Sequence, residues 1–182
     1  MATKKLKNAI HEFLSIQVVD FIVHVNAGIN YEVIEQRYAQ EDSPIHSFKS
    51  DIEITGVCLY PDDRASVPYI VNIYGHERNS KKLKEIYKDY YVRNQNGSVR
   101  YKKRKDGYIP VCEPPKSIGY IEKRRGKNLW TACAFVDNQT ITDMLVLLCK
   151  INPLYLSIHE VKEGRHRQVR SITLQNSDPA LE

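Results

Sequence analysis

The chain has 182 residues, of which 42% are hydrophobic and 27% charged, as is usual for a globular protein. No apolar run reaches about 18 residues, so the sequence predicts no membrane span. The N-terminal lysines precede no long apolar region, and we expect no secretory signal. We therefore predict one domain over 1–180, and 181–182 resemble a cloning scar.

Basic residues are concentrated in the second half of the chain, although the net charge is only +5. Residues 1–79 hold 7 Lys/Arg and 11 Asp/Glu, a net charge of −4, whereas 80–182 hold 20 and 11, a net charge of +9. Within the latter, 93–127 alone has 11 basic and 3 acidic residues. Such an excess attracts an anionic partner, a nucleic acid or an acidic protein. It also keeps sheet edges apart without any partner.

The first half predicts a short helix followed by strands. Residues 4–14 place apolar side chains at helical spacing. The alternation within 16–25 favours a strand, followed by a turn at 26–28 and a second strand at 29–38. A single helix through this whole segment is the alternative. Two further strands are expected, at 48–61 with a bulge at Gly56 and at 69–75.

The second half predicts two helices and three hairpins. The helices cover 79–92, capped by Asn79 or Ser80, and 138–153, capped by Asn138 or Thr140. The hairpins cover 98–111, 118–136 and 154–176, and each has a basic turn. In the first hairpin, "RKDG" carries a strong turn signal.

About eight to ten strands and two or three helices predict an α+β fold. We expect it to be predominantly antiparallel β, either sandwich-like or a meander of hairpins. No βαβ units alternate, which argues against a doubly wound nucleotide-binding fold.

The motifs of common catalytic and cofactor sites are missing. The sequence has no phosphate-binding loop, no dinucleotide fingerprint and no nucleophile elbow. Its four cysteines lack metal-ligand spacing, and Cys58, Cys133 and Cys149 lie among apolar residues. We interpret them as buried, reduced thiols of a cytoplasmic protein, and we predict no cofactor and no metal. His159 and Glu160 adjoin in a strand, point to opposite faces and should not share a ligand site.

Tyrosines are interleaved with the basic turns. Tyrosine can stack on bases while Lys and Arg hold phosphates, although tyrosine also suits half-buried strands. The candidate binding residues are Arg100, Tyr101, Lys102, Lys103, Arg104, Lys105, Tyr108, Arg124, Arg125, Arg165 and Arg167.

Three functions follow from these patterns. The first is a small, non-enzymatic binding protein that engages an anionic partner, such as nucleic acid, through its basic tyrosine-containing hairpins. The second is a protein-interaction or assembly module, for example a homo-oligomer. The third is a metal-dependent phosphodiesterase or nuclease with a dispersed site drawn from Asp62, Asp63, His76 and His159.

Overall fold

The computed structural model describes residues 9–29, 46–78, 80, 83, 90–104, 107–113 and 117–180. Its strands are β1 (Ile10–Ile29), β2 (His46–Tyr60), β3 (Pro68–His76), β4 (Tyr90–Tyr91), β5 (Tyr101–Arg104), β6 (Gly107–Pro110), β7 (Cys112–Glu113), β8 (Gly119–Lys123), β9 (Trp130–Asp137), β10 (Tyr155–Glu163) and β11 (His166–Gln175). The one α-helix with described bounds is α3 (Asn138–Lys150), and the 3₁₀ turn η1 is Asp62–Arg64.

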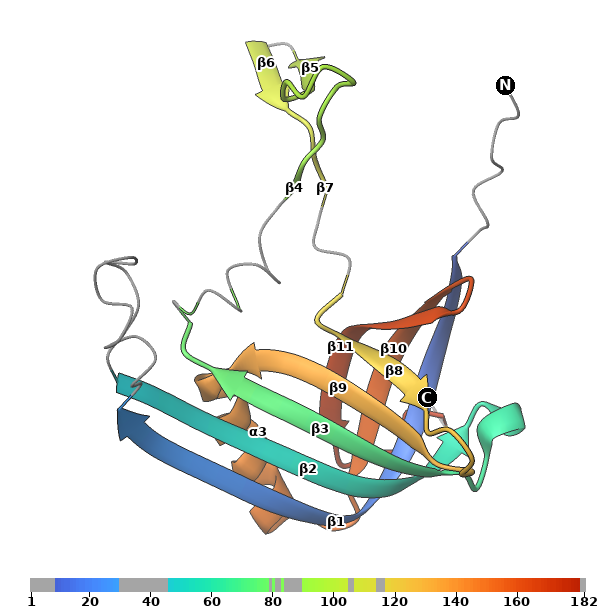
Figure 1. The fold of residues 1–182 in the computed structure, drawn as a ribbon. Coiled ribbons are helices and arrows are strands. Elements are labelled where there is room, and N and C mark those ends of the chain that lie inside the picture. Colours follow the sequence, from blue (N-terminus) through green and yellow to red (C-terminus); the bar gives the residue numbers. More distant parts are fainter. Residues whose placement is uncertain are drawn as a thin grey trace.

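Seven strands form a closed barrel in the order β1-β10-β11-β8-β9-β3-β2 (Figure 1). All neighbours are antiparallel except β3 and β9, which are parallel. The prediction of a sandwich or hairpin meander with two or three helices is therefore wrong. Alternation of apolar residues predicts strands but not closure. The barrel closes because the 20-residue β1 pairs both with β2 and with the late strand β10.

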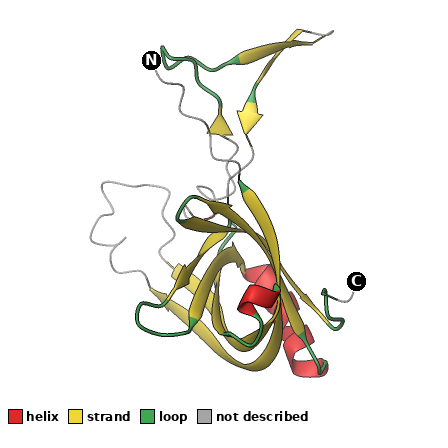
Figure 2. Ribbon diagram, turned by 90° about the vertical axis from the view of Figure 1, so that its right-hand side faces the viewer, coloured by secondary structure: helices red, strands yellow, loops and turns green. Residues whose placement is uncertain are grey.

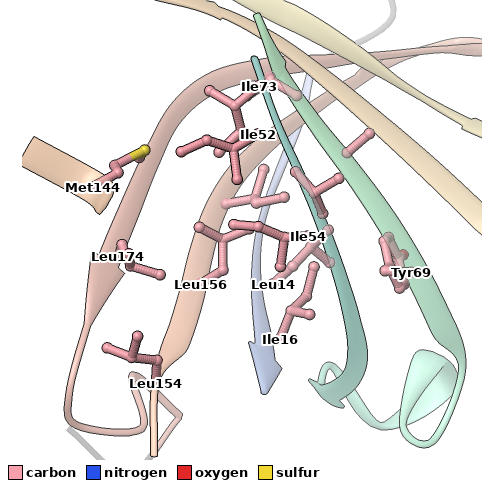
Figure 3. Close-up of a cluster of buried hydrophobic side chains, with 14 of the residues drawn as sticks. Leu14, Ile16, Ile52, Ile54, Tyr69, Ile73, Met144, Leu154, Leu156 and Leu174 are labelled. Atoms are coloured by element: carbon pink, nitrogen blue, oxygen red, sulfur yellow. The ribbon is translucent and has the colours of Figure 1, made fainter. Parts of the chain in front are cut away.

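The barrel interior is an apolar core that α3 covers at one end. Buried side chains from all seven strands face inward, and Figure 3 shows a cluster of them together with Met144 of α3. Ile141, Met144 and Leu148 form the buried stripe of the helix. We call this end, where β3 and β9 finish, the helix end.

The opposite end is closed differently. β1, β3 and β9 begin here, η1 joins β2 to β3, and the β8–β9 and β10–β11 turns are both at this end. Its inward side chains include Glu12, Glu160 and Arg167, and Arg64 of η1 reaches them. We call it the charged end.

Several predicted elements are confirmed and others are corrected. The three late hairpins and the helix at 138–153 are present, although Asp137 caps this helix by accepting from Thr140 N at 2.8 Å. Residues 10–14 are strand rather than helix, and β1 runs through the predicted turn at 26–28. Tyr90 and Tyr91 are strand rather than helix. Most of 79–92 and of 29–38 lies outside the described residues.

The predicted bulge at Gly56 lies on the partner strand instead. The register shifts between Val18 and Asp20, so Val19 of β1 is the extra residue. Gly56 is required for a close approach, since a Cβ there would lie 2.6 Å from the Gln17 carbonyl oxygen. The shift leaves the apolar alternation of β2 unchanged, and Ile52, Ile54 and Cys58 are all buried.

An insertion between β3 and β8 carries four short strands. β4 pairs with β7, and β5 with β6, in two sheets separate from the barrel. Figures 1 and 2 both show these pairs standing away from the barrel wall. We call residues 90–113 the arm. It joins the barrel at the helix end, because β3 finishes and β8 starts there.

Candidate nucleic-acid interface

Two of the three basic turns are at the charged end. β8 and β11 pair antiparallel, with Ile121 opposite Arg167. Beyond this pair, β8 continues to Lys123, and Arg165 precedes β11 in the β10–β11 turn. Arg124, Arg125 and Lys127 of one turn and Arg165 of the other are exposed.

A groove of about 520 Å³ runs between β8 and β11. Tyr120, Phe135, Glu122, Arg165, Arg167 and Gln168 are among the residues that line it. β8 and β11 share only three residue pairs, so the wall is less continuous here than between the longer pairs β1–β2 and β10–β11. The groove thus combines aromatic rings, cations, an amide group and one carboxylate.

An aromatic strip continues from the groove across the outer face of β9 and β3. Phe135 stacks with Tyr74 of β3, the ring centroids being 5.4 Å apart. Tyr120 is exposed, and its interaction with the Cys133 thiol raises the pKa of Tyr120 to about 12, so this phenol is neutral at physiological pH. The strip is a set of apolar rings bordered by positive charge.

One groove atom lacks a protein partner. The side-chain oxygen Oε1 of Gln168 is buried and accepts no hydrogen bond from any residue that the structure describes. A buried acceptor without a donor costs about 1–3 kcal/mol.

Inside the barrel, beneath the groove, is a buried ionic cluster that the sequence analysis missed. Arg64 donates from Nη1 to Glu160 Oε2 at 2.6 Å and from Nη2 to Glu12 Oε2 at 2.6 Å. Arg167 donates to Glu160 Oε1 and lies 3.6 Å from Glu12. Glu160 is 0% exposed and Arg64 is 3% exposed. Two cations thus balance two carboxylates, with Glu160 and Arg64 buried and Glu12 and Arg167 partly open to water.

Aromatic side chains complete the cluster. The guanidinium carbons of Arg64 and Arg167 lie 5.0 and 4.9 Å from the centroid of the Trp130 ring. Arg64 Nη1 also donates to Tyr69 Oη at 3.3 Å. Burial would lower the pKa of Arg64, but its hydrogen bonds to Glu160 and Tyr69 outweigh burial, and the pKa is raised. Burial raises the pKa of Tyr69 to about 12. Aromatic rings thus flank both guanidinium groups at the charged end.

The predicted binding residues fall into three groups. Arg124, Arg125 and Arg165 are exposed at the charged end. Arg167 is not in a turn, since its guanidinium is held by Glu160 inside the barrel. The remaining residues belong to the arm, and of these Lys105 lies outside the described residues: Arg100, Tyr101, Lys102, Lys103, Arg104, Lys105 and Tyr108.

The residues of the nuclease hypothesis are far apart. Asp62 and Asp63 are exposed in η1 at the charged end, whereas His76 lies at the other end of the nine-residue β3, about 30 Å away along the strand. His159 points outward from β10, forms a 3.0 Å hydrogen bond with His11 and stacks on Phe13, while the adjacent Glu160 points inward. Across the described ranges, no three His, Cys, Asp or Glu side chains are grouped to hold a metal ion.

The cysteine interpretation holds in part. Cys58 and Cys133 are free and buried, but Cys149 is free and exposed on α3. Burial raises the pKa of Cys58 to about 11, so this thiol is protonated and unreactive. In the part of the chain that is described, no helix is long and apolar enough to cross a membrane.

Comparison with known proteins yields no relative: no family model, curated protein or solved structure matches the chain.

Proposed function

We propose that the protein binds single-stranded nucleic acid on the outer face of β8, β9 and β3. The observation that carries this proposal is the groove between β8 and β11, which Tyr120, Phe135 and Arg165 line, with the basic turn 124–127 at the same end of the barrel. Cations beside exposed rings are the combination that single strands need, since phosphates bind the charges and bases stack on the rings.

Each part of the groove has a role in this proposal. Arg165 and the turn 124–127 contact phosphates, and Tyr120 and Phe135 stack on bases. Arg167 is left out of the contact set because Glu160 holds it. A duplex keeps its bases stacked inside and would not use the rings, which is why a single strand is favoured.

The test is fluorescence anisotropy of labelled oligo-dT and oligo-rU at several salt concentrations. Wild-type affinity should fall steeply as salt rises, since bound phosphates release counterions. Tyr120→Ala should weaken binding about 5-fold or more. Arg165→Ala should weaken binding and reduce the salt slope by about 1.

Two matched variants serve as controls. Tyr60 is 47% exposed, close to the 45% of Tyr120, but lines a different pocket, on β1 and β2. Lys150 is an exposed cation in the last turn of α3. Neither Tyr60→Ala nor Lys150→Ala should change affinity measurably. Absence of binding at low salt, binding that ignores salt, or equal losses at Tyr60 and Tyr120 would each contradict the proposal.

Assembly with other protein chains is the second candidate. The observation that favours it is a set of exposed apolar side chains on β1, among them Val19, Ile22 and Val25. An acidic first half could then meet the basic second half of another copy. Sizing chromatography across ionic strength tests this candidate, and a monomer at every salt concentration would remove it.

A cytoplasmic location is part of the proposal. The free thiols of Cys58, Cys133 and Cys149 suit a reducing compartment. Non-reducing and reducing electrophoresis of protein made in an oxidising compartment would test it, since mixed disulfides at the exposed Cys149 are expected only there.

A further inference from the structure

The β5–β6 ribbon of the arm has two chemically different faces. Tyr101 pairs with Pro110, Lys102 with Ile109 and Lys103 with Tyr108. Successive residues of a strand point to opposite faces. Tyr101, Lys103 and Tyr108 therefore share one face with Pro110, which we call the tyrosine face. Lys102 and Ile109 share the other.

The tyrosines of this face do not belong to a core. Tyr101 is 57% exposed and Tyr108 is 70% exposed, and all four residues of β6 are exposed. The ribbon forms a sheet of two strands, separate from the barrel. Tyrosine commonly fills half-buried strands, but more than half of each of these two side chains is open to solvent.

We propose that the tyrosine face is a second stacking site for the single-stranded nucleic acid of the proposed function, on which this inference rests. Tyr101 and Tyr108 are diagonal neighbours across the ribbon, and such pairs are about 7–8 Å apart. That spacing lets each ring stack on a separate base of an extended strand. Lys103 lies directly opposite Tyr108 and next but one to Tyr101, so it reaches the phosphate between the two bases.

Charge supports a nucleic acid over a neutral or basic partner. Residues 90–104 contain five basic side chains and no acidic one. Among them, Arg100, Lys102 and Lys103 are exposed. Single-stranded nucleic acid is the partner class that uses dense positive charge and free aromatic rings together.

The arm joins the barrel at the helix end, whereas the groove ends at the charged end. One strand that reaches both sites binds the second site intramolecularly, which raises the affinity without any new contact. The affinity should therefore increase sharply once the strand is long enough to span both sites. A short strand would occupy only one of them.

The experiment compares labelled oligo-dT of about 6 and about 30 nucleotides by anisotropy, on the full chain. The variant Tyr101→Ala/Tyr108→Ala should bind the long strand about 10-fold or more weakly than wild type. Its affinity for the short strand should change far less. Tyr101→Phe/Tyr108→Phe should bind like wild type, since stacking needs the ring and not the hydroxyl. Thermal melting checks that the barrel is unaffected.

A charge-matched pair separates the tyrosine face from plain electrostatics. Lys102 and Lys103 are adjacent, exposed and equal in charge, but lie on opposite faces. Lys103→Ala should weaken long-strand binding more than Lys102→Ala. Equal losses, together with an unaffected tyrosine variant, would overturn the inference.

Three further outcomes decide the remaining cases. If the tyrosine variant lowers the affinity for duplex DNA more than for a single strand of equal length, the ribbon inserts into a groove and the stacking site is wrong. If wild type binds long strands and Tyr120→Ala weakens them, but the tyrosine variant does not, the proposed function stands and this inference fails. If wild type binds neither strand, the proposed function itself fails.

Discussion

Replacing Glu160 by glutamine should destabilise the barrel strongly. Glu160 is fully buried and receives hydrogen bonds from both Arg64 and Arg167. Glutamine has nearly the same shape, so packing is preserved while one negative charge disappears. The cluster would then hold two guanidinium groups against the single carboxylate of Glu12. Arg64 is only 3% exposed, and water cannot compensate it.

The magnitude follows from the burial of both partners. Removing one partner of a buried ion pair costs about 3–5 kcal/mol. Glutamine retains one acceptor oxygen, and Arg64 keeps Glu12 and Tyr69, so we expect the lower end, about 3 kcal/mol. For a chain of this size, the melting temperature should fall by about 6–12 °C.

Urea unfolding followed by tryptophan fluorescence measures this loss directly. Trp130 is the one tryptophan of the chain and lies against both guanidinium groups. Glu12→Gln is the matched control, because its side chain is 30% exposed and water can replace the lost contact, at about 1 kcal/mol or less. The double variant Glu160→Gln/Arg167→Gln restores the charge balance and should lose less than the sum of its single variants.

A loss below about 1 kcal/mol for Glu160→Gln would refute the reasoning. It would mean that water reaches Arg64 in the folded protein. Equal losses for Glu160→Gln and Glu12→Gln would refute it as well, since burial would then not decide the cost.

Two further substitutions test the helix cap and the close packing between β8 and β9. Asp137→Ala should cost about 1 kcal/mol, measured by urea unfolding at neutral pH. Hydrogen bonding from Thr140 N lowers the pKa of Asp137 from 3.8. The cap therefore stabilises the fold above about pH 4, and this stabilisation is lost as the pH falls through the lowered pKa. An equal difference in stability between Asp137→Ala and wild type at pH 7 and at pH 2 would contradict this. Gly119→Ala should cost about 3 kcal/mol of stability or prevent folding, because its Cβ would lie 1.8 Å from the Cys133 carbonyl oxygen. Gly28→Ala is the control: the atom nearest to its Cβ would be 3.5 Å away, and this variant should melt like wild type.

The sequence predicted local structure correctly where the spacing of hydrophobic residues and the residue types at turns indicate the same element. The alternation in β2, β3 and β10 predicted which residues face the core, and Asp106-Gly107 predicted the turn between β5 and β6. The closure of the barrel could not be predicted from the sequence, because it depends on β1 pairing with β10, about 145 residues later in the chain. Residues 10–14 fit a helical period, yet this long-range pairing makes them a strand.

The ionic cluster had a partial signal in the sequence. Leu156 and Ile158 alternate inward, and Glu160 continues the same parity, so a carboxylate facing the core was foreseeable. Its partner was not, because Arg64 lies in a polar loop whose composition predicts exposure. Only the closed barrel brings η1 against β10. The same limit applies to the groove, whose walls come from strands joined by tertiary pairing.

The cluster and the groove meet at one strand. In β11, the Arg167 guanidinium donates to Glu160, and Arg167 also lines the groove together with the adjacent His166 and Gln168. β11 meets β8 through only three residue pairs, fewer than it forms with β10. The bonds from Arg167 to Glu160 fix the start of β11 from within, at the place where the ladder to β8 is shortest. The buried ion pairs therefore hold β11 in position next to the groove that the proposed function uses.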